Sequence, residues 1–329
     1  MAALFCFLGN YIQLVWYSKY LTLEWGNDII SVQKENIGVE YMNIKLITDS
    51  ACDLSIDYIK ENDIEVASLM VNLNGEFIPD DLGQTLKHED FYKIVKEGAM
   101  PSTTQVNVGT FHDMFIKYVK EGRQILYIGL SSGLSGTVSS AITARNMVLE
   151  EYPEANIYVV DSLSVSGGEG SLVYKAVEMI KNNVPIEEIV DYLESIKRKV
   201  IHAITVDDLN HLKRGGRISG AAAAVGGILG IKPTLKIDDE GKAVATEKLK
   251  GRKKALKSLV GQMKIKGENI EEQTIFICHA DCIDDALEVK KMVLEEFKVK
   301  DIIIISIGAV IGTHGGPGTL GLVFIGKER

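Results

Sequence analysis

Residues 124–137 read QILYIGLSSGLSGT, and this stretch decides the fold of the chain around it. The apolar run Gln124–Leu130 is typical of a buried strand, and the apolar periodicity after it predicts a helix over Ser135–Tyr152. Ser and Gly residues fill the junction, where a helix begins with unpaired N–H groups and a partial positive charge. A junction of this kind either binds an anion or is capped by a serine side chain. The local pattern leaves both interpretations open.

The same order of strand, polar loop and helix occurs elsewhere in the chain. Ile44–Thr48 and Ile157–Val160 read as strands, and Asp49-Ser50 and Asp161-Ser162 follow them directly. Strands that alternate with helices form a mostly parallel sheet covered on both faces, and ligands bind beyond the carboxyl ends of its strands. Asn74-Gly75, between two extended segments, predicts a hairpin. We therefore expect an α/β fold with its hydroxyl-rich loops at the ligand-binding edge of the sheet.

A second α/β region begins with a predicted strand at Val200. It continues through a helix of small residues over 221–229 and a hairpin around Asp239-Glu240-Gly241, followed by alternating helices and strands. We expect an N-terminal α/β domain over 43–199 and a C-terminal α/β domain over 200–329.

Composition limits the classes of function. The 329 residues are 46% hydrophobic and carry a formal net charge of -9. No basic stripe is visible, so nucleic acid is not an expected partner. The four cysteines are too few for a disulfide framework in a chain of this length. Cys278-His279-x-x-Cys282 has no second ligand pair, so we expect no metal site.

The first 42 residues differ from the rest. Leu4–Leu23 is apolar and aromatic, but it lacks the basic start and the cleavage site of a signal peptide. Polar residues interrupt it before about 18 apolar residues accumulate, so stable membrane insertion is not expected. Met42 directly precedes a clean strand. We therefore interpret residues 1–42 as an atypical extension and expect the native protein to start at Met42.

Three further segments carry polar side chains in unusual density. Pro101–Gln105 reads as a polar loop with adjacent hydroxyl groups, and a solvated turn also explains it. Arg217 lies in a Gly-rich turn, where it could pair with a carboxylate or a phosphate. His314 lies in the Gly-rich segment Ile311–Gly318, where it is either a ligand donor or a structural residue. No hydrolase elbow, metalloprotease motif or paired catalytic base accompanies these segments.

Taken together, these motifs resemble the DegV family, and the resemblance covers about Ile44–Gly326. The matching segments, in chain order, are Ile47–Ser50, Pro101–Gln105, Ser131–Thr137, Asp161-Ser162, Leu212–Ser219, Ile231–Pro233 and Gly312–Gly321. The chain is similar in particular to the fatty-acid carriers of bacterial fatty acid kinases. The resemblance implies a two-domain α/β fold that encloses a long-chain fatty acid such as palmitate. It also implies a cytoplasmic protein that needs no cofactor and is not an enzyme by itself.

The resemblance also implies where the ligand is held. The family's carboxylate-binding Thr and Ser correspond to Thr103 and Ser135, and Ser132, His314 and Arg217 are further candidates nearby. A separate fatty acid kinase would then transfer phosphate from ATP to the bound carboxylate. The chain departs from the family pattern at Val106, where a proline is usual.

Two other functions remain open on the residues alone. The protein could be an enzyme that acts on a small carboxylated or phosphorylated substrate at the same loops. It could also be a structural or regulatory module whose lipid is a folding cofactor. The absence of a base, a metal cluster or a nucleotide motif counts against the enzyme.

Overall fold

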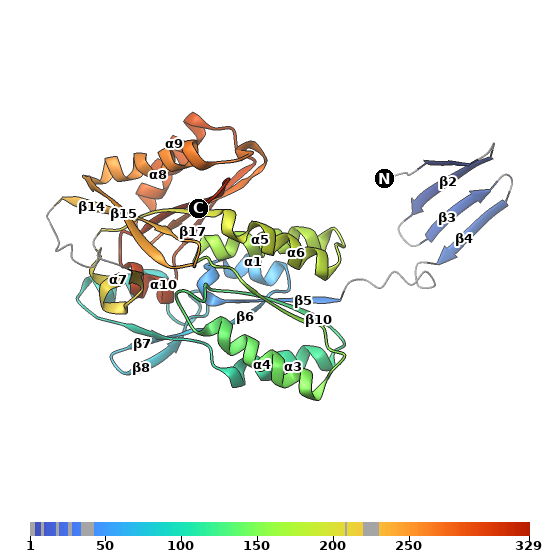
Figure 1. Ribbon diagram of the computed structural model, residues 1–329, viewed down its shortest axis with the longest axis horizontal. Helices are drawn as coiled ribbons and strands as arrows, with labels where there is room; N and C mark the ends of the chain where they lie inside the picture. Colours follow the sequence, from blue (N-terminus) through green and yellow to red (C-terminus); the bar gives the residue numbers. More distant parts are fainter. Residues whose placement is uncertain are drawn as a thin grey trace. The chain divides into compact units, whose positions relative to one another are not determined.

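The computed structural model describes residues 43–207, 209–219 and 230–329, together with the backbone of four strands before residue 34 (Figure 1). The chain divides into two compact units, Met1–Asn43 and Ile44–Arg329. In the first unit, four strands form an antiparallel sheet: β1 Leu4–Phe7, β2 Asn10–Tyr17, β3 Tyr20–Trp25 and β4 Asp28–Gln33. Met42 lies outside the described residues, and the start at Met42 stays a prediction.

The second unit opens with the parallel sheet that the sequence predicts. Its strand order is β11-β10-β5-β6, with β5 Ile44–Asp49, β6 Glu65–Ala67, β10 Gln124–Gly129 and β11 Ile157–Asp161. Helices α3 and α4 lie on one side of this sheet, and α1, α5 and α6 on the other (Figure 1). They span Ile56–Glu61 (α1), Val108–Lys120 (α3), Thr137–Glu151 (α4), Gly167–Lys181 (α5) and Ile186–Ile196 (α6). Every residue of β5 is buried, as expected for a strand covered on both faces.

The strands of a small antiparallel sheet come between β6 and β10 in the sequence. Its order is β8-β7-β9, with β7 Met70–Leu73, β8 Glu76–Pro79 and β9 Ser102–Thr104, and α2 spans His88–Lys96. The predicted hairpin is confirmed: Asn74 and Gly75 have positive φ angles of 57° and 94° and join β7 to β8. The prediction of a polar loop over Pro101–Gln105 is wrong for Ser102–Thr104. This stretch pairs with the free edge of β7, because threonine suits an extended backbone.

The second region forms a mixed seven-stranded sheet in the order β13-β15-β14-β12-β18-β16-β17. The strands are β12 Val200–Thr205, β13 Ile218–Ser219, β14 Ile231–Ile237, β15 Ala243–Lys250, β16 Thr274–His279, β17 Asp301–Ser306 and β18 Leu320–Ile325. Helices α8 Arg252–Lys266 and α9 Ile283–Glu296 pack together on this sheet over a cluster of buried aliphatic side chains. The division into two domains at residue 200 stays a prediction.

Helix α5 contacts strands of both sheets and so joins the two halves of the unit. Its first turn is the Gly-rich stretch Gly167–Gly170. A Cβ atom on Gly167 would lie 2.5 Å from Cys278 Sγ, and one on Gly168 would lie 1.9 Å from His202 Nε2. Glycine therefore allows the helix to start against the second sheet.

Two short helices near the predicted ligand segments complete the fold. α7 spans Asn210–Gly215, and the glycine that follows it, Gly216, has a left-handed φ of 67°. α10 spans Ala309–Gly315, so the predicted Gly-rich loop over Ile311–Gly318 is in part a helix. The predicted helix over 221–229 lies outside the described residues. In the described part of the chain, no helix has the length and apolar character needed to cross a membrane.

Candidate functional site

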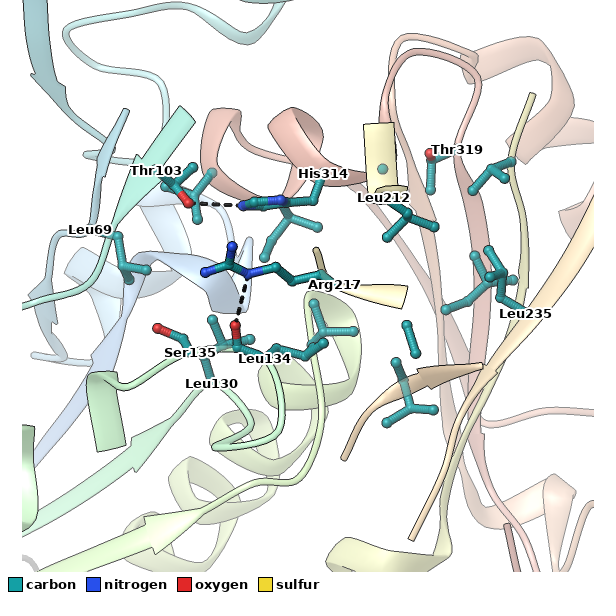
Figure 2. Close-up of a pocket in the computed structure, with 18 of the residues that line it drawn as sticks. Leu69, Thr103, Leu130, Leu134, Ser135, Leu212, Arg217, Leu235, His314 and Thr319 are labelled. Atoms are coloured by element: carbon teal, nitrogen blue, oxygen red, sulfur yellow. Dashed lines mark hydrogen bonds between the residues drawn. The ribbon is translucent and has the colours of Figure 1, made fainter. Parts of the chain in front are cut away.

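A cavity of about 370 Å³, which we call the site cavity, lies among β9, the loop after β10, α10 and the second sheet. Its volume falls within the roughly 300–1,000 Å³ typical of ligand pockets. Most of its lining is apolar, as in Leu69, Leu130, Leu134, Val165, Ile204, Val206, Leu212, Leu235, Ile237 and Val310. The polar side chains include Thr103, Thr104, Gln105, Ser135, Arg217, His314 and Thr319. Thr103, Ser135, Arg217 and His314 gather at one end, and Leu212 and Leu235 lie away from them (Figure 2).

Thr103 and His314 meet across the cavity, although 211 residues separate them in the chain. Strand β9 carries Thr103 and α10 carries His314, and Thr103 Oγ1 lies 2.8 Å from His314 Nε2 (Figure 2). Gly215 leaves room for the imidazole, because a Cβ atom there would lie 2.2 Å from His314 Nδ1. Burial lowers the pKa of His314 to about 4, and the nearby Arg217 and His211 add to this effect. His314 is therefore neutral at pH 7.

Ser135 lies just before α4, on the loop after β10. Gly136 is the N-cap residue, so the prediction of Ser135 as the N-cap or a first-turn residue of the helix is wrong. Its hydroxyl instead lies 2.9 Å from Thr137 Oγ1 and accepts a hydrogen bond of 3.3 Å from Thr137 N. A Cβ atom on Gly136 would lie 2.2 Å from Gln105 Oε1, so this glycine lets the two hydroxyl-rich stretches pack against each other.

Arg217 and Ser132 differ in their relation to the cavity. The guanidinium of Arg217 donates from Nε to Leu134 O at 3.2 Å (Figure 2) and from Nη1 to Gly215 O. Its side chain is exposed, so it offers a positive charge at the polar end of the site cavity. Ser132 is exposed, its N–H donates to Asp161 Oδ1 at 3.1 Å, and it is not among the lining residues. Of the predicted ligand-binding residues, the structure thus brings together Thr103, Ser135, His314 and Arg217.

The loop after β10 also contacts the turn between β14 and β15. Ser131 Oγ donates to Gly241 O at 2.8 Å, and a Cβ atom on Gly133 would lie 2.5 Å from Glu240 O. Gly133 therefore leaves room for the turn of the second region.

Buried carboxyl groups hold the elements behind the site. Asp49 accepts from Tyr127 Oη at 2.7 Å and from Leu130 N at 2.9 Å, which ties the end of β5 to the loop after β10. Asp53 accepts from Gly308 N, and Asp80 accepts from Val310 N, at the start of α10. Burial raises the pKa of Asp49 to about 6 and that of Asp80 to about 7. Sequence analysis noted Asp49 as a loop residue but missed Asp53 and Asp80, which have no motif around them.

The arrangement combines neutral hydroxyl donors, one imidazole and one exposed cation at the end of an apolar cavity. Such a site suits an elongated apolar molecule with one anionic head group. The described residues contain no group of three or more His, Cys, Asp or Glu side chains placed to hold a metal ion.

Comparison with known proteins identifies relatives over nearly all of the second unit. A family model described as "Uncharacterised protein, DegV family" matches residues 43–327. A DegV domain-containing protein of Clostridium perfringens is 46% identical over 284 residues, which cover 86% of this chain and 98% of the relative.

Two solved structures illustrate the likeness in three dimensions. A structure described as fatty acid binding of a DegV family protein from Thermus thermophilus has a TM-score of 0.79 and 31% identity, and covers 87% of this chain and 100% of that chain. A stearic acid-binding protein from Eubacterium ventriosum has a TM-score of 0.77 and 28% identity, and covers 86% of this chain and 98% of that chain.

Proposed function

The chain belongs to the DegV family, and from this premise we propose that it binds a long-chain fatty acid in the site cavity. The proposal rests on how the lining of that cavity is arranged: hydroxyl groups lie at one end, and aliphatic side chains line the rest. The relatives described as binding fatty acid and stearic acid support the same ligand class.

The aliphatic walls supply most of the affinity. Each CH₂ group moved from water into an apolar cavity contributes roughly 0.8 kcal/mol. A chain of the length of palmitate or stearate therefore binds tightly even though few polar contacts hold its head. The affinity depends on the buried part of the chain, so it increases with chain length until the cavity is full.

The carboxylate head lies, in this proposal, between Thr103 and Ser135. A buried carboxylate without hydrogen bonds is strongly destabilised, and two hydroxyl donors remove much of that penalty. Among the described residues, the side-chain partner of Thr103 Oγ1 is His314 Nε2 and that of Ser135 Oγ is Thr137, so each hydroxyl is able to turn toward a ligand. His314 and the exposed Arg217 supply further donors at the same end.

We further propose that the bound carboxylate is presented to a fatty acid kinase. A carboxylate oxygen attacks the γ-phosphorus of ATP held by the kinase, ADP leaves, and the carrier retains an acyl phosphate. The added negative charge favours a site with a cation within reach, and Arg217 meets that need. The proposal sets the protein in the cytoplasm of a bacterium, where ATP and the kinase are available. The carrier itself contributes no catalytic residue.

The binding site is tested with the double variant Thr103→Ala plus Ser135→Ala. We expect it to lose the fatty acid that co-purifies with the wild-type protein and to bind added stearate at least about a hundredfold more weakly, because two hydrogen bonds to a charged group are removed. Native mass spectrometry measures the first quantity and calorimetry the second. Ser132→Ala is the matched control, since this hydroxyl lies outside the cavity. An unchanged fatty acid content in the double variant would show that the site is wrong.

The carrier role needs a separate measurement. The stearate-loaded protein is mixed with a bacterial fatty acid kinase and ATP, and acyl phosphate is detected after reaction with hydroxylamine. Formation of acyl hydroxamate that requires the loaded protein supports the carrier. Binding of stearate without any acyl phosphate would refute the carrier role and leave a lipid-binding module.

A further inference from the structure

Strand β17 stands at the end of the seven-stranded sheet, where β16 pairs with one of its edges and no described strand pairs with the other. Successive residues of a strand direct their N–H and C=O groups to alternate sides. Asp301 N donates to Gln273 O at 3.4 Å, and Ile307 N donates to His279 O at 2.8 Å. The odd-numbered residues of β17 therefore face β16, and the even-numbered residues face away from the sheet.

The outward residues of β17 are Ile302, Ile304 and Ser306. Ile302 N donates to Asp301 Oδ1 at 2.7 Å, but the described residues accept no hydrogen bond from the N–H of Ile304 or of Ser306. The run Ile302–Ile305 consists of β-branched residues, which favour an extended backbone. An uncovered edge of this kind pairs readily with a further strand. β17 is therefore available for strand pairing.

Helix α9 presents an apolar stripe to solvent on one of its sides. Ile283, Leu287 and Leu294 are 46%, 51% and 55% exposed, although all three are large aliphatic residues. Their spacing of four and seven residues places them one above the other on the helix, and we call them the α9 stripe. A different face packs on the sheet, and its buried residues are Ala286, Val289 and Val293.

The α9 stripe faces the open edge of the sheet. Arg252 of α8 binds Asp285 at 2.8 Å, and Lys264 of α8 binds Glu296 at 3.4 Å, so α8 lies on the side of α9 that carries these two acids. At 3.6 residues per turn, that side is about half a turn away from the stripe. The two helices lie side by side (Figure 1), with α8 on β12 and β14 and α9 on β16. In the order β14-β12-β18-β16-β17, the side of α9 away from α8 is the side of β17.

A second copy of the chain fits both exposed features at once. When β17 pairs antiparallel with the same strand of the copy around a two-fold axis at Ile304, the two Ile304 residues exchange their outward hydrogen bonds. Ile302 of each copy then lies opposite Ser306 of the other. The two sheets become continuous, and the two α9 helices lie antiparallel on the same face. Their stripes face each other across the axis.

The charges of α9 also suit an antiparallel copy. Glu288 and Lys291 are exposed, and they lie equally far from the middle of Ile283–Glu296. In a two-fold antiparallel pair, Glu288 of each copy is therefore level with Lys291 of the other, and two pairs of opposite charge form. A parallel pair of helices would set equal charges against each other, which is unfavourable.

We propose that two copies of the chain associate through antiparallel pairing of β17, with the α9 stripes covering each other. The contact uses one strand and one side of one helix from each copy, which is less than the roughly 20–30 residues a side of a standard interface. We therefore expect a reversible dimer with a dissociation constant of about 1–100 μM. No residue of β17 or of the α9 stripe lines the site cavity, so the dimer is independent of the proposed fatty acid binding.

Leu287→Glu and Leu294→Glu test the contact, and sedimentation equilibrium of the full-length chain over a concentration series measures it. Each variant places a carboxylate in the contact twice because of the two-fold axis. We expect the dissociation constant to rise at least about a hundredfold in each. Ile265→Glu is the matched control, since Ile265 is 75% exposed on α8 and lies outside the contact. It should leave the dissociation constant within about twofold of the wild-type value.

Hydrogen exchange on the unaltered protein removes any dependence on how the variants fold. We expect amide exchange in β17 to slow as the protein concentration rises, because the outward N–H groups of Ile304 and Ser306 become paired. Strand β11, which ends the parallel sheet, is the internal control and should exchange at a constant rate. A monomer at every concentration would overturn the proposal. A dimer that both Glu variants leave intact, or that forms without slower exchange in β17, would also overturn it, since such a dimer uses another surface.

Discussion

Asp80 shows how one buried carboxyl group can position a site that it does not line. Its Oδ2 accepts from Val310 N at 3.0 Å and so anchors the first turn of α10, the helix that carries His314. Its side chain is buried, and this burial raises its pKa to about 7, with further increases from the charges of Asp81 and Asp49. The group is therefore about half protonated at neutral pH, and its charge opposes folding at higher pH.

Asp80→Asn is predicted to change the pH dependence of stability. The folded pKa of about 7 lies above the unfolded value of about 3.9, so the protonated carboxyl stabilises the fold below about pH 4, and this contribution is lost as the pH rises through 7. We expect the wild-type protein to lose roughly 1–4 kcal/mol relative to the Asn variant between pH 4 and pH 8. Urea unfolding at several pH values measures the difference. The pKa values of His202 and His314 are lowered in both proteins, so their effect on the free energy of unfolding cancels in the difference between wild type and variant.

The matched control for this prediction is Asp57→Asn, at an exposed position on α1. Its stability difference from wild type should stay constant between pH 4 and pH 8. If the Asp80→Asn difference is equally constant, burial of Asp80 does not govern the pH dependence.

At the scale of the element, long periodic segments could be predicted from sequence and short ones could not. The strand at Gln124 and the helix α4 lie within a few residues of their predicted bounds, because their apolar periodicity runs over several turns or pairs. Strand β9 has only three residues, and its extended form depends on β7. Helix α10 depends likewise on the distant carboxyl groups at its first turn. Tertiary contacts decide such elements, and local sequence does not encode them.

The candidate site likewise contains residues that could be predicted from the sequence and residues that could not. Its polar residues Thr103, Ser135, Arg217 and His314 stand in dense motifs, and the resemblance of those motifs to the DegV family singles out Thr103 and Ser135 among them. The aliphatic wall could not be predicted, because residues such as Leu69 and Leu235 are ordinary core residues until the fold brings them together. Whether the predicted polar residues bind the carboxylate stays a prediction that the double variant tests.

The turn between β14 and β15 gives a prediction at this scale. Gly241 has a φ of 74°, and a Cβ atom there would lie 1.9 Å from Ser131 Oγ. We expect Gly241→Ala to destabilise the protein by about 2–4 kcal/mol, from backbone strain and from separation of the turn and the loop after β10. Thermal and urea unfolding measure the loss, and stearate affinity should fall because that loop carries Ser135.

Gly75→Ala is the control for this prediction. Gly75 has a φ of 94° in the β7–β8 turn, but a Cβ atom there meets nothing within 4 Å. The loss of stability in Gly75→Ala therefore measures backbone strain alone. Equal losses in the two variants would mean that the contact between Ser131 and Gly241 contributes nothing to stability.

At the scale of the whole unit, Arg329 fixes three segments that meet where the two sheets adjoin. Its guanidinium donates to Ser164 Oγ and Lys197 O in the first half and to Val200 O and Asp238 O in the second. Removal of the guanidinium leaves partly buried carbonyl oxygens without a donor, which costs about 1–3 kcal/mol for each buried group.

We therefore predict that Arg329→Ala lowers the free energy of unfolding by roughly 2–4 kcal/mol. Chemical denaturation measures this change. Lys327→Ala is the control, because Lys327 is exposed and close in sequence. A loss in Arg329→Ala no larger than in Lys327→Ala would show that Arg329 does not hold the segments together.

The hydrogen bond between Thr103 and His314 has a consequence for biosynthesis. The ribosome makes Thr103 and Ser135 long before His314, because the bond spans 211 residues of the chain. While the second region is still being translated, the first region presents hydroxyl groups and half of an apolar wall, but no enclosed space. A nascent chain therefore has no enclosed cavity, and under the proposed fatty acid binding the ligand enters only after the last strands are released.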